Sequence, residues 1–316
     1  MNISDVNSHI QWMSSSLSAL TLLLLGGGFL LLIVILGVLA NITVCIVMLR
    51  NRGFKKHISN FMLVHLAITD IVHRLIVVPV QLIAMFIPLQ NKPVLLCKVA
   101  KTLLHTVRTA VFTSLVMIAS DRHQSITKPF QRLRHKPKFY LYVSAVWGYS
   151  IISAMPKMYS EGIQSHVYNF TLPNDQMNKT YSWHVCSSSK GSTERALAAV
   201  CFFLGFLAPL IIITVAYSKM TLYLWKKSRN RATNQAALKS KGKALRMLML
   251  LVLGFVVCLG IPQVNDFLDS FGSYYPAFFL LALVLQLSSS LVNPVIYGFY
   301  SAEFKQGLQN RKIRWR

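Results

Sequence analysis

A long apolar run of the sequence ends at residues 120–130 with the stretch SDRHQSITKPF. Asp121 and Arg122 stand side by side where the hydrophobic helix runs out, and Pro129 follows a few residues later. An acid next to a base in this position is compatible with an ordinary helix end, a catalytic dyad, or a switch at a membrane surface. The rest of the chain decides among these three interpretations.

The composition is that of a membrane protein. Of the 316 residues, 54% are hydrophobic and only 13% are charged, which is too apolar for a soluble chain of this length. Apolar runs that could cross about 30 Å of hydrocarbon, which takes roughly 20 residues of helix, cover residues 17–49, 61–87, 94–120, 140–158, 196–224, 245–268 and 274–299. The sequence therefore predicts an all-α membrane protein, a seven-transmembrane helix bundle over residues 17–300. The N-terminus, residues 1–16, is expected outside the cell. Residues 301–316 are expected to form an amphipathic helix and a short cytoplasmic tail.

Basic residues indicate how the bundle is oriented. They gather at 50–56, 128–138, 226–243 and 305–316, which all lie on one side of the predicted spans. By the positive-inside rule this side is cytoplasmic, so the N-terminus is predicted to be extracellular in a multi-pass protein of the plasma membrane. The net charge of +24 then reflects topology and contact with anionic membrane lipid, and nucleic acid is not an expected partner.

Features of the opposite side agree with this orientation. Three glycosylation sequons, at Asn2, Asn169 and Asn178, all fall on the predicted outside. Cys97 and Cys186 also face that oxidising compartment, so a disulfide between them is expected.

Polar residues and prolines recur in a fixed order along the spans. They are Asn41 in GVLANITV, Asp70 in LAITD followed by Pro79, Asp121-Arg122-His123, Trp147, Pro209, Tyr217, and Asn293-Pro294-Val295-Ile296-Tyr297. In order and spacing, over nearly the whole chain, this set resembles the rhodopsin-like G-protein-coupled receptors. The resemblance implies that a heterotrimeric G protein docks on the cytoplasmic face.

The resemblance also implies roles for individual residues. Arg122 is expected to be held by Asp121 at rest and then released to line the G-protein cleft; a guanidinium that exchanges partners makes a two-state switch. The other residues expected to act in activation and coupling are Tyr217, Asn293, Pro294 and Tyr297. Asn41, Asp70, Ser290 and Asn293 are expected to form an interior polar site. Asp70 could bind sodium there, although Val111 stands where a serine is usual; no other cofactor and no metal is expected.

Span six departs from the family pattern. Gly260 stands two residues before Pro262, where a tryptophan is usual, and aligning on Phe255 instead puts Leu259 there. The usual aromatic relay is therefore in doubt, and a pronounced kink before the proline is expected. The inner end of this span has only basic residues and no acid for Arg122, which predicts ligand-independent signalling.

Charged residues also occur in the outer half of the bundle, where exposure to lipid would be costly. Arg74 lies one turn after Asp70, and Lys101, His105 and Arg108 share a face of span three. One interpretation pairs Asp70 with Arg74 or Arg108 as a fixed ion pair that replaces sodium. The other makes Arg108 and Lys101 a site for a carboxylate or a phosphate. The candidate ligand pocket comprises Arg74, Lys101, His105, Arg108, Gln263 and Asp266.

Acidic residues on the opposite wall favour a peptide that carries both charges. Asp266 and Asp269 lie near the outer end of span six and Glu161 after span four, although the first two could simply be solvated. The segments SHVYNF and YSWHVC suit two short strands over the pocket.

The sequence therefore predicts a receptor that signals an extracellular peptide or anionic small molecule to G proteins. Alternatives are a signalling-silent or constitutively active receptor and, less well supported, a multi-span transporter, for which no internal repeat is seen. An enzyme is not expected, because no nucleophile with a base and no clustered metal ligands occur.

Overall fold

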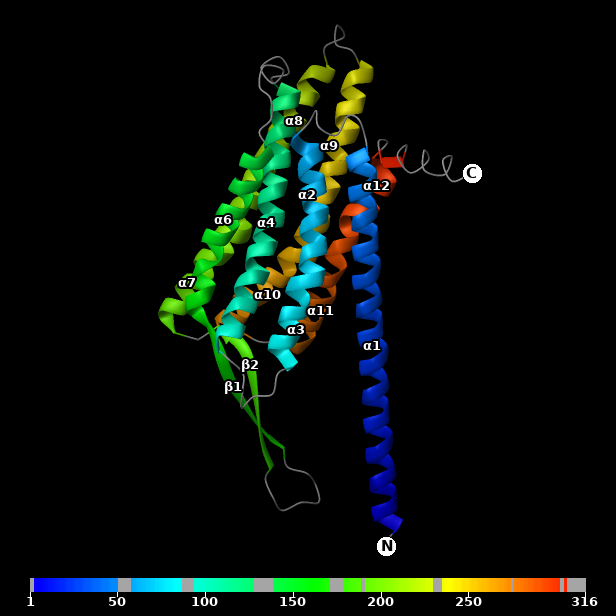
Figure 1. The fold of residues 1–316 in the computed structure, drawn as a ribbon, viewed down its shortest axis with the longest axis vertical. Coiled ribbons are helices and arrows are strands. Elements are labelled where there is room, and N and C mark those ends of the chain that lie inside the picture. Colours follow the sequence, from blue (N-terminus) through cyan, green and yellow to red (C-terminus); the bar gives the residue numbers. More distant parts are fainter. Residues whose placement is uncertain are drawn as a thin grey trace, which may run out of the picture.

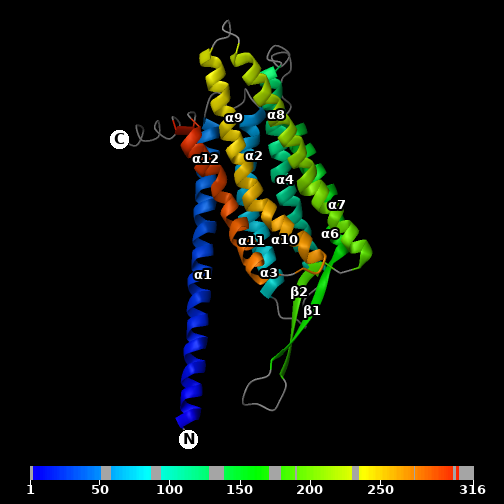
Figure 2. The ribbon, with the colours of Figure 1, turned by 180° about the vertical axis from the view of Figure 1, so that it is seen from behind.

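Long helices run side by side to form the body of the molecule (Figure 1). The computed structural model describes residues 3–50, 58–86, 94–127, 139–170, 179–188, 191–229, 235–273, 275–301 and 304–305. The N-terminus and a two-stranded hairpin lie at one end of the bundle, and α8 and α9 extend at the other; the view from behind shows the same arrangement (Figure 2).

Seven rods make up the described part of the bundle, several of them built from consecutive helical pieces. They are α1 (Ile3–Arg50); α2 (Ile58–Val72) with η2 (His73–Val77) and α3 (Val78–Phe86); α4 (Val94–Thr127); α6 (Phe139–Ser160); α7 (Ser192–Phe202) with η4 (Phe203–Leu207) and α8 (Ala208–Ser228); α9 (Gln235–Phe255) with η5 (Val256–Gly260) and α10 (Ile261–Ser270); and α11 (Pro276–Ser288) with η6 (Ser289–Leu291) and α12 (Val292–Tyr300). Each rod coincides with one predicted apolar run, so the expected helix bundle is confirmed.

Six of these rods are long and apolar enough to cross a membrane. The exception is α6, whose 22 residues include four serines and Lys157, which lower its mean hydropathy. The first rod is longer than predicted, because α1 begins at Ile3 and takes in most of the stretch expected as an N-terminal tail. The sequence of α1 contains no proline that would interrupt the helix before Arg50.

Three of the rods contain a wide π-helical turn, and a proline follows each turn. Pro79, Pro209 and Pro262 stand at the second position of α3, α8 and α10, directly after η2, η4 and η5. A proline has no N–H, and its ring crowds the carbonyl group four residues earlier, which lies within the π turn in each case. The wider turn relieves this crowding. The kink expected near Gly260 is therefore present as η5.

The hairpin expected from the sequence is also present. Strand β1 (Glu161–Phe170) pairs antiparallel with β2 (Lys179–Ser188), in a register that runs from Glu161 opposite Ser188 to Phe170 opposite Lys179. The disulfide between Cys97 and Cys186 is confirmed and ties β2 to α4. The base of the hairpin meets the bundle, but its far end projects away from the helices and not across them (Figures 1 and 2).

The apolar core occupies the middle of the bundle and the half that lies away from the hairpin. Phe112, Phe255, Leu251 and Tyr297 are essentially inaccessible to solvent and belong to one cluster. Leucine, isoleucine and phenylalanine side chains line the outside of the rods, as a surface in contact with lipid requires. Buried charged residues gather toward the outer half, where the candidate site lies.

Candidate functional site

At the end of the bundle opposite the hairpin, Asp121 and Arg122 join α4 to the first turn of α2. The Asp121 carboxylate accepts a hydrogen bond from the backbone N–H of Ser59, with an N···O distance of 3.0 Å, and so satisfies a donor at a helix N-terminus. The Arg122 guanidinium donates to the Asn60 side-chain oxygen at 3.2 Å. Neither partner on α2 was predicted from the sequence. Tyr217 is buried in α8, and its hydroxyl has no hydrogen-bond partner among the described residues.

Deeper in the bundle, the predicted interior polar residues lie in two hydrogen-bonded groups. Asn41 donates its amide to the Ser290 carbonyl oxygen at 2.7 Å. This carbonyl is free because Pro294, four residues later, has no N–H to donate to it. Asn293 donates to an Asp70 carboxylate oxygen at 2.8 Å, and the Tyr297 hydroxyl donates to the Asn293 side-chain oxygen at 3.4 Å. These contacts link α1 and α2 to the last rod.

Arg74 does not line a ligand pocket, contrary to the prediction. Its Nη2 group donates to the carbonyl oxygens of Gln286 and Leu287, at 2.9 and 3.1 Å, and to the Ser289 hydroxyl at 2.7 Å. These acceptors lie where α11 gives way to η6, and a cation is favourable at the carbonyl end of a helix. Of the two interpretations left open by the sequence, the ion pair is not seen: among the described residues, neither Arg74 nor Arg108 forms an ion pair with Asp70.

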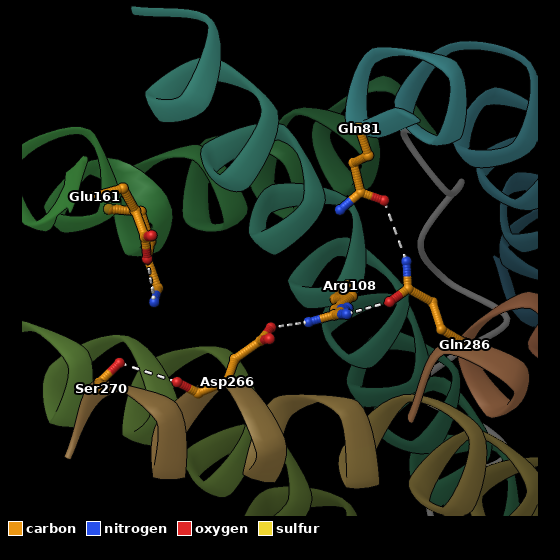
Figure 3. Close-up of polar contacts among 7 residues, drawn as sticks. Gln81, Arg108, Glu161, Asp266, Ser270 and Gln286 are labelled. Carbon is orange, nitrogen blue, oxygen red and sulfur yellow. Dashed lines mark hydrogen bonds and ion pairs between the residues drawn. The ribbon is translucent and has the colours of Figure 1, made fainter. Parts of the chain in front are cut away.

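Arg108 is the centre of the outer site (Figure 3). Its guanidinium forms an ion pair with Asp266 of α10 and donates a second hydrogen bond to the Gln286 side-chain oxygen of α11. Gln286 in turn donates to Gln81 of α3 at 3.4 Å. Only 3% of the Arg108 side chain is exposed, so the ion pair is nearly dry on the arginine side. One side chain of α4 thus ties together the outer halves of four rods.

A second ion pair lies beside the first. Lys157 of α6 and Glu161 at the start of β1 are 2.9 Å apart, and both are buried. Between the two pairs lies a small cavity lined by Lys101, His105, Lys157, Glu161, Asp266, Asp269 and Ser270. Its volume of about 10 Å³ is room for about one water molecule. A neighbouring hollow of the same size is lined by the buried Gln263 and also by His105 and Asp266.

The structure therefore brings together every predicted pocket residue except Arg74. Asp266 is not merely solvated at a helix end, because it is the partner of Arg108. Gln286, Gln81 and Lys157 were missed by the sequence interpretation. Gln286 is the sole polar residue before Ser288 in the apolar stretch PAFFLLALVLQLS, and Lys157 stands four residues before Glu161; both patterns were available as signals.

The fold and this site define a multi-pass membrane protein whose helices enclose a charged cavity. The profile of the family described as "7 transmembrane receptor (rhodopsin family)" matches residues 40–297. The chain belongs to this family of G-protein-coupled receptors.

Individual relatives are receptors for neuropeptides. The neuropeptide FF receptor 2 of Rattus norvegicus is 28% identical over 291 residues, which cover 85% of this chain and 68% of that protein. The neuromedin-U receptor 2 of Homo sapiens is 27% identical, over 87% of this chain and 68% of that protein. The galanin receptor type 1 of Homo sapiens is 26% identical, over 86% and 76%.

Proposed function

We propose that the chain is a receptor that takes a peptide at its outer cavity and activates a heterotrimeric G protein at its cytoplasmic face. Family membership and the neuropeptide names of the relatives support this proposal. The structural observation that most supports the proposed function is the arrangement of charges around Arg108. Acidic and basic side chains from different rods meet there and, in this conformation, already neutralise one another.

A ligand that enters this cavity must replace the partners it displaces. A buried charge left without a partner is strongly unfavourable, so a ligand that separates Arg108 from Asp266 has to offer an anion to the first and a cation to the second. A peptide with a cationic side chain and a carboxylate or carbonyl group meets both needs. An anionic small molecule would satisfy Arg108 but leave Asp266 unpaired, which makes it the second candidate.

The cytoplasmic face suits a receptor with measurable basal activity. The inner part of α9 reads QAALKSKGKALR and contains no acid, so within α9 no carboxylate holds Arg122. The resting conformation is thereby less restrained, and we expect nucleotide exchange on the G protein without ligand.

A sodium ion has no part in the proposed mechanism, because the residues around Asp70 fit it poorly. One Asp70 oxygen accepts a hydrogen bond from Asn293, and Val111 offers no oxygen. The Ser290 hydroxyl donates to the Leu287 carbonyl at 3.2 Å, and the cation of Arg74 lies one turn along the same rod.

The plasma membrane location and the extracellular N-terminus belong to the same proposal. The N-terminus and the hairpin lie at one end of the bundle, and the basic ends of α8 and α9 lie at the other (Figure 1). The charged cavity belongs to the hairpin end, because Glu161 at the start of β1 lines it. Asn169 falls in β1, at the cavity end, while Asn2 and Asn178 and most of the tail at 301–316 lie outside the described residues. Contact with anionic membrane lipid is expected at the basic end.

Nucleotide exchange on purified heterotrimers tests the proposal directly. The receptor in lipid nanodiscs should accelerate nucleotide exchange. A panel of peptides that includes neuropeptide FF, neuromedin U and galanin should contain activators. Arg122→Ala should abolish the acceleration of exchange. Arg195→Ala, an exposed arginine of α7, serves as the matched control. A folded receptor that accelerates no heterotrimer, with or without peptides, would support the silent receptor or the transporter instead.

A further inference from the structure

The space beside Gly260 is filled by an aromatic ring from another rod. Gly260 is buried in η5, and a Cβ atom added to it would lie 2.7 Å from Cζ and 2.9 Å from Cε2 of Phe206. A Cβ atom essentially never approaches a non-bonded carbon this closely, so any side chain at position 260 requires the ring to move. The ring of Phe206, in η4, thus stands where the missing tryptophan of span six would project.

Phe206 packs against aromatic rings on both sides. Its ring meets that of Phe112 in α4 edge-on, with centroids 5.2 Å apart, and that of Phe202 at 5.5 Å. Phe202 stacks in turn on Phe267 of α10 at 4.7 Å. Aromatic pairs of this geometry add to the stability that burial provides. Phe206 therefore links the centre of α4 to both η5 and α10.

The residue before Phe206 touches the wall of the charged cavity. A Cβ on Gly205 would lie 2.7 Å from Nε2 of His105 and 2.8 Å from the Thr109 hydroxyl, so these α4 side chains rest against the bare backbone of η4. His105 lines the cavity. Both polar atoms are buried and have no hydrogen-bond partner among the described residues. A ligand that displaces His105 must therefore disturb the backbone that carries the Phe206 ring.

We propose that Phe206 is the positioning residue through which the cavity acts on span six. Displacement of His105 shifts η4, the ring leaves Gly260, and α9 is then free to turn about the wide turn before Pro262. Because η4 and η5 are both π turns, each can tighten by one hydrogen bond without breaking its rod. This inference rests on the proposed receptor function and deepens it by naming the relay.

A double-mutant cycle between positions 260 and 206 tests the proposal. Gly260→Ala forces the ring aside, Phe206→Leu removes the ring but keeps an apolar side chain, and the double variant relieves the crowding. Gly254→Ala is the matched control: its Cβ would meet Val292 of α12 at the same distance of 2.7 Å, with no contact to Phe206.

Two readouts separate this inference from the proposed function. The first is ligand-free nucleotide exchange on the G protein. The second is the distance between spin labels at Lys239→Cys in α9 and Tyr140→Cys in α6, two exposed positions, with Cys45 and Cys258 replaced by alanine. The second readout needs no G protein, so it reports the movement of span six even if no heterotrimer responds.

We expect Gly260→Ala and Phe206→Leu each to raise basal exchange and to shift the label distance, and Gly260→Ala to add little to either in the Phe206→Leu receptor. The effects at 260 and 206 should differ from additivity by about twofold or more in rate, as for other residues in contact. Gly254→Ala should combine additively with Phe206→Leu. If Gly260→Ala has the same effect with and without the ring, the proposal is overturned. If Gly260→Ala does not fold, a Phe206→Leu receptor whose basal exchange and label distance equal those of the parent overturns it equally.

Discussion

At the scale of single residues, the two buried arginines of the described structure differ in what they do, although both lie inside spans. Arg108 joins an acid and an amide on other rods beside the cavity. Arg74 binds the carbonyl end of a helix and is closed off from the cavity. The first is therefore available to a ligand, and the second serves to hold α11 in place.

Removal of one member of the ion pair between Arg108 and Asp266 should destabilise the folded receptor. We expect Arg108→Ala to lower the free energy of unfolding by about 3 kcal/mol, the lower end of the range for breaking a buried pair, since the Asp266 side chain keeps 30% exposure. The double variant Arg108→Met with Asp266→Leu should recover most of this loss. Thermal unfolding in detergent measures both. Lys101→Met, which changes another cation of the same cavity, should cost much less; an equal loss would contradict the assignment.

Arg74→Met should destabilise the receptor without altering ligand selectivity. Hydrogen bonds from a charged donor contribute about 1.5–3 kcal/mol, and the variant leaves two carbonyl groups of α11 without this donor. We expect a loss of about 2 kcal/mol in the free energy of unfolding. The control is Arg195→Met in α7, where an exposed arginine changes in the same way and should shift stability by less than about 0.5 kcal/mol. Equal behaviour of the two variants would show that the carbonyl groups find other donors.

Sequence patterns predicted these residues in part. A charged residue within an apolar run faces the bundle, and helical spacing placed Lys101, His105 and Arg108 on one face correctly. Spacing along one helix says nothing about the partner on another, however. Arg108 and Asp266 are 158 residues apart, and the pairing of Arg74 with α11 depends on where that helix ends. The interior group around Asp70 was expected only from the family resemblance.

At the scale of elements, the apolar runs predicted all seven rods, because a membrane span needs a fixed length of apolar sequence. The wide turns were harder to predict from the sequence. Prolines marked their positions, but a proline can kink a helix, end it or widen one turn, and packing against neighbouring rods selects among these outcomes. The Phe206 ring beside Gly260 is the clearest case: the sequence indicated that a side chain was missing, but not which ring takes its place.

The basic inner part of α9 leads to a prediction about basal activity. An acid introduced at Gly242, a half-buried position with open space around its Cα, should restrain Arg122 and lower ligand-free nucleotide exchange. An ion pair of this kind contributes up to about 1 kcal/mol, so the rate should fall by up to about fivefold. Lys243→Glu places an acid at the exposed neighbouring position and should have little effect on this rate. Equal decreases in both variants would indicate a general effect of charge.

At the scale of the whole molecule, a disulfide connects strand β2 of the hairpin to α4 of the bundle. Cys97 and Cys186 are 89 residues apart in sequence, and their bond holds the base of β2 beside the start of α4, next to the charged cavity. The hairpin strands pair only with each other in the described structure, and a two-stranded hairpin is marginal on its own. The disulfide therefore determines where this segment meets an approaching ligand.

Loss of the disulfide should weaken both stability and peptide response. We expect Cys186→Ser to lower the free energy of unfolding by roughly 2–5 kcal/mol, as for other native disulfides, and to raise the peptide concentration needed for half-maximal nucleotide exchange. Cys258→Ser changes a cysteine that forms no disulfide and should leave the peptide response intact. Reductant should reproduce the Cys186→Ser phenotype in the parent receptor. A parent receptor whose unfolding temperature is unaffected by reductant would refute this prediction.

The three π turns have a consequence for comparing this receptor with its relatives. Successive side chains of an α-helix are rotated by about 100° around the helix axis. A turn that holds one additional residue therefore changes the direction of every side chain beyond it. A relative that aligns without gaps in its cytoplasmic half, but has an ordinary turn before one of these prolines, would present a different set of side chains to its peptide. Counting outward from Asp70, Pro209 or Phe255 crosses one of these turns and is thus a poor guide to which pocket residues are equivalent. A one-residue deletion at such a turn should change ligand selectivity while leaving the G-protein face as it was.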